Sequence, residues 1–294
     1  MKIGTLFSGI GAPEFAMESA NIKHTIAYAC DNDPHVKRTY LANHRPEIWY
    51  DDVTDITNPP EVDLLMFGFP CQPFSLAGHR NGLKDARGRL VWSAIKMLGK
   101  SRPKMIIAEN VEGLVRHDNG RTLPIILKSM RGYGYHVQWQ LLNSLHFGLP
   151  QNRNRIWIVG VRKDYEFPVG EKSHIPLKDL LDKNAPQDVF ATEDFLAKPK
   201  VQKRLADYTK DYMNCITMAT VCRGGSSSEY ISAVAAINRA IGQTRKPTVQ
   251  ECLRLFGFPE GFKFPDEVCK TRRYAMLANS MAVPVVRNVI ENLM

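Results

Sequence analysis

The chain has 294 residues, of which 44% are apolar and 23% charged, and its formal net charge is +9. These values are typical of a globular protein with one large domain, or a large and a small one, and the basic balance permits a polyanionic partner. No segment approaches the roughly 20 apolar residues that span a bilayer, and residues 1–6 lack the layout of a signal peptide. The sequence therefore favours a cytoplasmic protein and argues against a membrane partner.

Strand-like and helix-like segments alternate through the first half of the chain. Strands are expected at 2–7, 25–30, 62–68, 105–108, 135–142 and 155–161, and helices at 13–20, 34–43, 90–98 and 121–130. Two of these strands, 62–68 and 105–108, are nearly all apolar, as strands buried on both faces of a parallel sheet are. The alternation predicts an α/β fold with a doubly wound, mostly parallel sheet.

The pattern changes after about Lys178. Residues 182–210 are polar with no clear period, 223–228 have the composition of a loop, and helices are expected only at 248–256 and 284–293. We therefore expect one domain from residues 1–181 and 276–294, and a smaller irregular domain with a hinge at 182–275. Between residues 198 and 247 the chain has nine basic and three acidic residues, which favours a surface that faces phosphates.

The six cysteines, Cys30, Cys71, Cys215, Cys222, Cys252 and Cys269, form no Cys-x-x-Cys pair and have no pair of histidines nearby at zinc-ligand spacing. The sequence therefore predicts no metal site. In a cytosolic protein such cysteines are expected to be reduced, and most of them to be small core residues.

A glycine-containing loop, Phe7-Ser8-Gly9-Ile10-Gly11, follows the first strand and opens the first helix. Glycines there let the backbone approach a ligand near the helix N-terminus. Nicotinamide-dependent oxidoreductases usually have a further glycine where this chain has Glu14, which argues against that class. Asp31 and Asp52 follow the next strand-like stretches, and a carboxylate at such a strand end suits the ribose of a nucleoside cofactor.

The most specific string is Gly68-Phe69-Pro70-Cys71-Gln72-Pro73-Phe74-Ser75. It follows a strand that is expected to be buried, so Cys71 should lie on a loop at the carboxyl edge of the sheet, where ligands bind in such folds. A proline on each side of the Cys-Gln pair restricts the backbone and aims the thiol. The pattern favours a reactive cysteine over one that only fills the core.

At this string the sequence resembles the cytosine-C5 DNA methyltransferase family of bacteria and phages. Further strings that resemble family motifs are Ala108-Glu109-Asn110-Val111, Gln151-Asn152-Arg153-Asn154-Arg155, Arg254-Leu255-Phe256-Gly257-Phe258-Pro259 and Asn279-Ser280. The resemblance covers nearly the whole chain; only residues 182–246 have no close family string. It implies a Rossmann-like catalytic and S-adenosylmethionine-binding domain, with 182–275 as the target-recognition domain and hinge.

The resemblance also implies a set of catalytic residues. Cys71 would add to C6 of cytosine and so make C5 nucleophilic, which divides one difficult step into two easier ones. Glu109, when protonated, would hydrogen-bond N3 and the exocyclic amine. Arg153 and Arg155 match the family's arginines near the base, and Arg153 could stabilise negative charge that develops at O2. The sequence does not identify the base that removes the C5 proton.

The implied cofactor is S-adenosylmethionine, with S-adenosylhomocysteine as its product and no metal. The residues expected to bind it are Phe7, Ile10, Gly11, Asp31, Asp52, Pro70, Leu90, Asn279 and Met281. Asp31 stands where the family usually has Glu, so its shorter side chain would have to come closer to the ribose.

The implied substrate is double-stranded DNA, from which the target base must flip out to reach Cys71. Residues 75–89 are long, polar and glycine-containing, like the family's loop that closes over the base. The expected DNA-binding residues are Ser75, Arg87, Gln151, Thr217, Arg223, Gly224 and Gly225. A monomer is expected, and a cognate restriction endonuclease acting on the same site is a further partner if the role is restriction-linked rather than orphan or phage-protective.

Two alternatives stay open at this point. A tRNA cytosine methyltransferase of the same fold tends to have a Pro-Pro-Cys core and a Cys-Phe-Thr tripeptide, whereas this chain has Phe69-Pro70-Cys71 and no Cys-Phe-Thr. A non-catalytic DNA-binding relative would be expected to lose the cysteine, the glutamate or an arginine, and this chain keeps all of them.

Overall fold

A computed structural model describes residues 1–70, 90–162, 165–171, 173–221 and 227–294. The chain divides into two compact units. Unit 1 comprises Met1–Leu142, Asn154–Val169 and Val286–Met294, and unit 2 comprises Asn143–Arg153 and Gly170–Val285. None of the helices in the described ranges is both long and apolar enough to cross a membrane.

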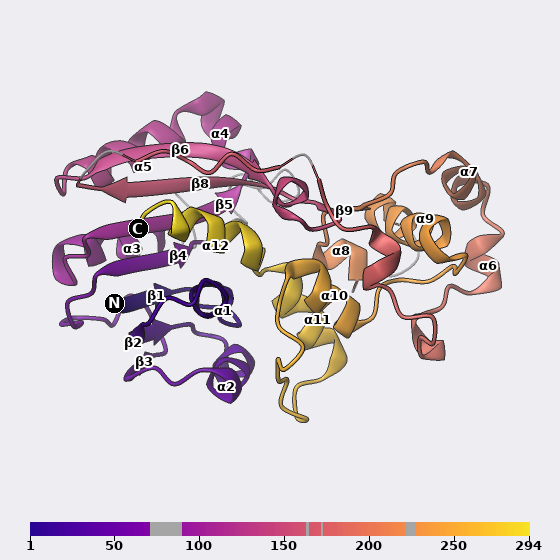
Figure 1. The fold of residues 1–294 in the computed structure, drawn as a ribbon, viewed down its shortest axis with the longest axis horizontal. Helices are drawn as coiled ribbons and strands as arrows, with labels where there is room; N and C mark the ends of the chain where they lie inside the picture. Colours follow the sequence, from indigo (N-terminus) through magenta and orange to yellow (C-terminus); the bar gives the residue numbers. More distant parts are fainter. Residues whose placement is uncertain (71–89, 163–164, 172, 222–226) are drawn as a thin grey trace. The chain divides into compact units, whose positions relative to one another are not determined.

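The described part of unit 1 is built on one sheet of seven strands in the order β3-β2-β1-β4-β5-β8-β6 (Figure 1). The strands are β1 (Lys2–Leu6), β2 (Thr25–Cys30), β3 (Ile48–Tyr50), β4 (Leu64–Gly68), β5 (Met105–Val111), β6 (His136–Asn143) and β8 (Asn154–Val161). Strands β3, β2, β1, β4 and β5 pair in parallel, and β8 pairs antiparallel with β5. The predicted doubly wound, mostly parallel fold is confirmed.

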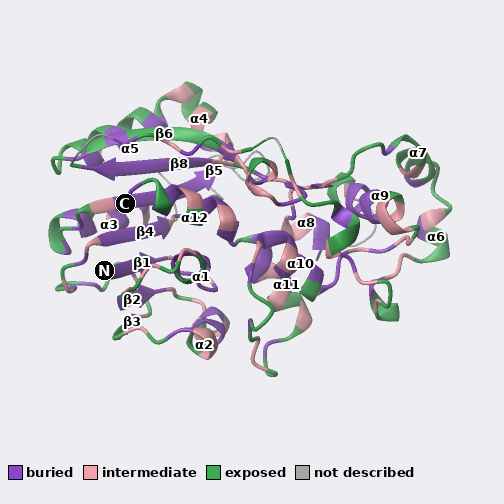
Figure 2. Ribbon diagram, in the orientation of Figure 1, coloured by how far each residue is buried: buried purple, intermediate pink, exposed green. Residues whose placement is uncertain are grey.

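Helices alternate with these strands along the chain. They are α1 (Ala12–Ser19), α2 (Pro34–Asn43), α3 (Leu90–Lys100), α4 (Gly113–Arg116), α5 (Thr122–Arg131) and α12 (Val283–Glu291). Figure 2 shows the central strands buried and the edge strand β6 largely exposed. Buried and exposed residues alternate poorly along β6, where only Val137 and Leu142 are buried. In β8, by contrast, every residue from Ile156 to Val161 is buried.

Unit 2 is mainly helical, with one short parallel pairing of β7 (Gln151–Asn152) and β9 (Met213–Asn214). Its helices are α6 (Glu193–Leu196), α7 (Pro199–Asp207), α8 (Met218–Val221), α9 (Ser228–Ile241), α10 (Val249–Phe256) and α11 (Lys270–Ala278). A small core of Phe195, Val201, Tyr230, Ile231 and Val234 joins α6, α7 and α9. The sequence pattern misses α7, α9 and α11. The assignment of recognition to residues 182–275 stays a prediction, because the contacts of the fold do not test it.

A buried ion pair anchors the start and end of the variable segment in unit 2. Arg245 and Glu251 are both fully buried, and the Arg245 Nη2 atom lies 2.6 Å from Oε1 of Glu251. Asp182 joins them, because its N–H donates to Glu251 Oε1 at 2.7 Å and its carbonyl accepts from Arg245 at 2.8 Å. Glu251 also completes a capping box with Thr248 at the start of α10. Charge-assisted hydrogen bonds therefore hold the two ends of the segment, Asp182 and Arg245, next to each other.

Candidate active site

The loop between β1 and α1 has an unusual backbone. Phe7, Gly9 and Gly11 all have positive φ, at 52°, 55° and 83°. Phe7 is not a glycine, and such a conformation in a bulky residue marks a locally constrained backbone. The N–H of Gly9 donates to Oδ2 of Asp31 at 3.0 Å, so the strand end after β2 fixes the shape of the loop.

Gly11 can only be a glycine in this structure. A Cβ atom at Gly11 would lie 2.2 Å from Nε2 of His44, and its φ favours the left-handed region. Burial lowers the pKa of His44 to about 4, so the imidazole is neutral near pH 7. A neutral ring can pack closely against the loop backbone without adding a buried charge.

Two carboxylates lie at strand ends, as the sequence predicts. Asp31 follows β2 and accepts from the N–H groups of Gly9 and Asp33, and burial raises its pKa. Asp52 follows β3, is half-buried, and accepts from Thr54 through Oδ1. Asp31 is only half-buried, so part of its side chain stays open to a further donor. The strained loop with its glycine cradle and the carboxylate beside it fit a nucleoside ligand with a diol.

The other expected cofactor residues belong to different elements. Ile10 is buried in the loop, Pro70 is half-buried after β4, and Leu90 is half-buried at the start of α3. Asn279 and Met281 belong to unit 2, where Asn279 is exposed and Met281 half-buried. A direct hydrogen bond links the loop, through Gly9, to Asp31. The roles of Asp31 and of the other expected residues in binding a cofactor stay predictions.

The backbone that leads to Cys71 is anchored to β5. Gly68, the last residue of β4, pairs with Glu109, and the side chain of Asn110 donates to the carbonyl of Phe69 at 3.0 Å. Asn110 is buried, so this hydrogen bond is protected from water. The Glu-Asn-Val motif thus holds the chain two residues before the cysteine.

Glu109 and Arg155 form an ion pair on neighbouring antiparallel strands. The Nε atom of Arg155 lies 3.1 Å from Oε1 of Glu109, and the two side chains are 15% and 12% exposed. Such a pair keeps both side chains in one orientation while leaving a small part of each open to a ligand. The structure brings these two predicted catalytic residues together.

Arg153 points elsewhere. It is 3% exposed, and its guanidinium donates to the carbonyls of Ser280 at 2.5 Å and Ile216 at 3.4 Å and lies 4.9 Å from the ring centroid of Phe256. These partners occupy the guanidinium with contacts inside unit 2. The charge-stabilising role at the base that the sequence predicts for Arg153 stays a prediction, and the contacts inside unit 2 indicate that the side chain also holds this part of the fold together.

The side chain of Gln151, which the sequence predicts to bind DNA, is fully buried. Its amide donates to the carbonyl of Leu255 at 2.9 Å and accepts from the N–H of Ile216 at 3.2 Å. Both ends of the side chain are therefore used inside unit 2, and its contact with DNA stays a prediction. Thr217, which follows Ile216, is half-buried. Its N–H donates to the hydroxyl of Thr220 in α8, and its own hydroxyl accepts from the N–H of Thr220.

Several expected site residues lie outside the residues that the structure describes. They are the nucleophile Cys71 and the expected DNA contacts Ser75, Arg87, Arg223, Gly224 and Gly225. Their roles stay predictions.

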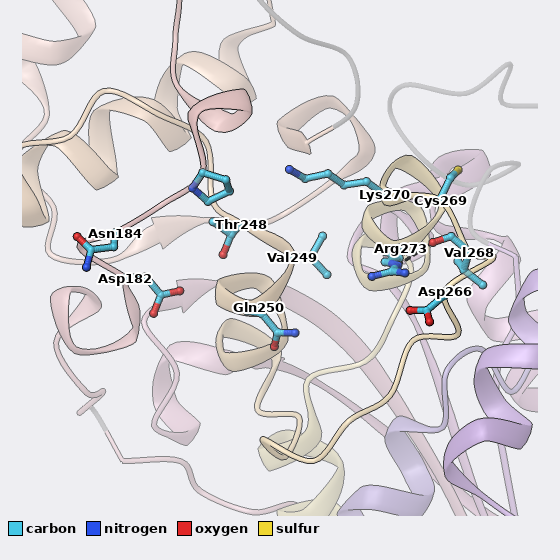
Figure 3. Close-up of a pocket in the computed structure, with 11 residues that line it drawn as sticks. Asp182, Asn184, Thr248, Val249, Gln250, Asp266, Val268, Cys269, Lys270 and Arg273 are labelled. Carbon is cyan, nitrogen blue, oxygen red and sulfur yellow. Dashed lines mark hydrogen bonds between the residues drawn. The ribbon is translucent and has the colours of Figure 1, made fainter.

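A cavity of about 500 Å³ lies within unit 2, near the first turns of α10 and α11 (Figure 3). Thr248, Val249 and Gln250 line one side, and Cys269, Lys270 and Arg273 line another. Lys270 is paired with Asp188, and Arg273 donates to the carbonyls of Val268 and Pro265. None of the described residues with a predicted role lines this cavity, so it adds nothing to the candidate active site.

Sequence reasoning missed two residues that shape the site. Asn110 is visible only as part of a motif, without a role of its own. Glu14 appears only as a departure from a glycine pattern, and nothing in the sequence indicates that its carboxyl is buried under the loop. The structure shows Glu14 with no exposed surface.

Comparisons with known proteins identify relatives of this chain. A family model described as C-5 cytosine-specific DNA methylase matches residues 1–294. The Type II methyltransferase M.Bsp6I of Bacillus sp. (strain RFL6) is 32% identical over 318 residues, which cover 100% of this chain and 98% of that protein. The Type II methyltransferase M.NlaX of Neisseria lactamica is 33% identical over 302 residues, which cover 99% and 96%.

Solved structures show the same fold at low identity. The methyltransferase EhMeth of Entamoeba histolytica superposes with a TM-score of 0.78 at 18% identity, over 100% of this chain and 97% of that one. The Dnmt2 methyltransferase of S. pombe gives 0.75 at 22% identity, over 99% and 97%.

Proposed function

This chain belongs to the C-5 cytosine-specific DNA methylase family, and we propose that it transfers a methyl group from S-adenosylmethionine to C5 of a cytosine flipped out of a short duplex sequence. The observation that carries the proposal is the family match over residues 1–294, which includes Cys71. The Glu109–Arg155 pair supports it, because it supplies a carboxyl and a guanidinium at one sheet edge.

Cys71 is the proposed nucleophile. Its thiolate forms a bond to C6, and the electrons of the C5–C6 double bond move to C5, which then attacks the methyl carbon. S-adenosylmethionine would supply that methyl group from its sulfonium, and the bond between the methyl carbon and sulfur would break to release S-adenosylhomocysteine. A base then removes the proton at C5, the double bond re-forms, and the bond between C6 and Cys71 breaks to return the thiolate. Atoms and charge balance without a metal.

Glu109 and Arg155 are the proposed groups that bind the base. A protonated Glu109 would donate to N3 and accept from the exocyclic amine, and Arg155 would stabilise the negative charge that develops on the ring. Arg155 also orients the Glu109 carboxyl through their 3.1 Å contact. Asn110 would act indirectly, by holding the carbonyl of Phe69 and hence the backbone before Cys71.

The loop from Phe7 to Gly11 and the Asp31 carboxylate are the proposed donor-binding groups. The loop offers backbone atoms, and Asp31 offers a carboxylate to the ribose diol. The family resemblance also assigns Asp52, Leu90, Asn279 and Met281 to donor binding, and these assignments are part of the proposal.

Residues 182–246 are the proposed source of target choice. Lys200 and Lys203 are exposed on α7, where they would contact phosphates, and residues 217–230 are the proposed base-reading segment. Grafting 182–246 from a relative with another target should transfer that target, since Asp182 and Arg245 close the segment at its base. A folded, active chimera that still methylates the original site would contradict this assignment.

The decisive experiment incubates the protein with radiolabelled donor and either mixed duplex DNA or total tRNA, with Cys71→Ala as the control. Label should enter duplex DNA alone, and bisulfite sequencing of that DNA should give one short sequence with methylated cytosine. Label in tRNA alone would favour an RNA-modifying enzyme. Label in neither would contradict the proposed activity.

A further inference from the structure

Glu14 is a buried carboxyl beneath the loop from Phe7 to Gly11. It lies in the first turn of α1 with no exposed surface. Its Oε1 atom accepts from the Tyr40 hydroxyl at 2.6 Å and from the Thr5 hydroxyl at 2.9 Å, while Oε2 has no hydrogen-bond partner among the described residues. Both partners are neutral hydroxyls, so the carboxylate is solvated by dipoles and not by a cation.

This environment leaves the charge of Glu14 finely balanced. Burial raises its pKa to about 7, against the opposing effect of the hydrogen bonds from Tyr40 and Thr5. The ionised and neutral forms are therefore both populated near neutral pH. A carboxyl with this property lies directly under a loop that is proposed to bind the methyl donor.

A chain of hydroxyl groups connects Glu14 to that loop. The Oγ1 atom of Thr5 lies 2.8 Å from Oγ of Ser8, and Ser8 Oγ accepts from the N–H of Cys30 at 3.0 Å. Thr5 has one hydroxyl proton. An ionised Glu14 can only accept, so Thr5 donates its proton to Oε1 and can then only accept from Ser8, whose own proton goes either to Thr5 or to the carbonyl of Cys30 at 3.2 Å. A neutral Glu14 that carries its proton on Oε1 would donate instead, and Thr5 would then donate to Ser8, so the charge of Glu14 can reverse the hydrogen-bond chain that ends at Ser8.

Ser8 is placed to transmit this effect. It lies between Phe7 and Gly9, both of which have positive φ, and it fixes the loop to the last residue of β2 through Cys30. A change in the Ser8 hydrogen bonds would alter the constraint on Phe7, the non-glycine residue of this loop with positive φ.

The other titratable groups around Glu14 behave differently. Tyr40, from α2, has its pKa raised well above the usual value by burial and by Glu14, and burial keeps His44 neutral near pH 7. Glu18, one turn further along α1, is half-exposed at its side chain and 3.6 Å from His44. Asp31 holds Gly9 from the opposite side of the loop.

We propose that Glu14 is a positioning residue for the methyl donor: its ionised carboxyl orders Thr5 and Ser8 beneath the loop from Phe7 to Gly11, and the loop binds the donor in that state. This inference rests on the proposed donor site. It makes donor affinity depend on pH through a group that touches neither donor nor DNA.

The test is calorimetric titration of the full chain with S-adenosylhomocysteine between pH 6 and pH 8, which measures binding without turnover. If only the ionised form binds, wild-type affinity should rise about tenfold over this range, because the competent fraction rises by that factor. Glu14→Gln keeps an acceptor for Tyr40 and Thr5 but has no proton to lose. Its affinity should stay near the wild-type value at pH 8 and be independent of pH.

Two further variants separate positioning from a general loss of structure. Tyr40→Phe removes a hydrogen bond that favours the ionised carboxyl, so the midpoint of the pH dependence should move to higher pH. Glu18→Gln, on the same helix, removes a like charge that raises the pKa of Glu14, so the midpoint should move in the opposite direction, to lower pH. A Glu14→Gln profile that still follows pH would overturn the inference alone, whereas a wild type that binds neither S-adenosylhomocysteine nor S-adenosylmethionine would overturn the donor site as well.

Discussion

Arg155 Nε lies 3.1 Å from Oε1 of Glu109, across the antiparallel pairing of β8 with β5. In the proposed mechanism the pair binds the target base and Arg155 fixes the orientation of the carboxyl. Glu109→Gln should therefore keep the shape but lose the acid, and the turnover number should fall by ~10²–10⁴-fold. The measurement is steady-state methylation of duplex DNA. Affinity for S-adenosylhomocysteine should be unchanged, because Glu109 is not part of the proposed donor site.

The partner of this pair provides the matched experiment. Arg155→Gln should also lower turnover, and the double variant should lose less than the product of the two single effects, since residues in one contact act together. Multiplicative losses in the double variant would mean that the 3.1 Å contact has no role in catalysis.

The raised pKa of Glu14 makes a prediction for stability as well as for binding. Its folded pKa of about 7 is above the ordinary value of 4.5, so the folded chain holds the proton more tightly than the unfolded chain does. The favourable contribution is complete below pH 4.5 and is lost as the pH rises through 7.

Glu14→Gln cannot ionise, so the stability of this variant should not fall as the pH rises through 7. Relative to wild type, the variant should be more stable at pH 8 than at pH 5 by about 2–3 kcal/mol, from 1.36 kcal/mol for each pKa unit. The measurement is urea unfolding of both proteins at the two pH values. An equal difference in stability at pH 5 and pH 8 would show that the carboxyl does not titrate in this range.

The buried pair of Arg245 and Glu251 should be costly to break. Both side chains are fully buried, so Glu251→Gln leaves a buried guanidinium without its counter-charge and should lower the free energy of unfolding by ~3–5 kcal/mol. Replacing both residues, as Arg245→Met with Glu251→Leu, should recover much of that loss because no charge is left unpaired. Denaturant unfolding measures both, and a single variant that costs less than ~1 kcal/mol would contradict the assigned role.

The fold of unit 1 could be predicted largely from the sequence, because its buried strands are nearly continuous apolar runs. The ranges expected for β2 and α2 are those observed. Helix α9 was missed for a physical reason. Its residues from Tyr230 to Ile237 are all buried, so the exposed polar residues that usually mark one face of a helix lie only near its ends. Helix α7 escapes sequence-based prediction because the stretch around it is polar and charged and only Val201 of the helix is buried.

The site could be predicted only in part. The motifs identify which residue types are present, and the contact between Glu109 and Arg155 agrees with their joint assignment. The motifs do not show which polar side chains are hydrogen-bonded to backbone groups inside the fold. Gln151 and Arg153 are used in this way, and only tertiary contacts with segments more than 60 residues away reveal it. The hydrogen bonds of Glu14 with Tyr40 and Thr5, which are 26 and 9 residues away, also appear only in the folded structure.

The central claim is that Cys71 attacks C6 of cytosine in DNA, and trapping with 5-fluorocytosine tests it most directly. Fluorine at C5 cannot leave as a proton does, so the bond between Cys71 and the base should persist after methyl transfer. Duplex DNA that carries 5-fluorocytosine at the target should give, with S-adenosylmethionine, one denaturation-resistant adduct that peptide mass spectrometry assigns to Cys71. Cys71→Ala should give none. An adduct at Cys215 or another cysteine, or full methylation by Cys71→Ala, would contradict the account.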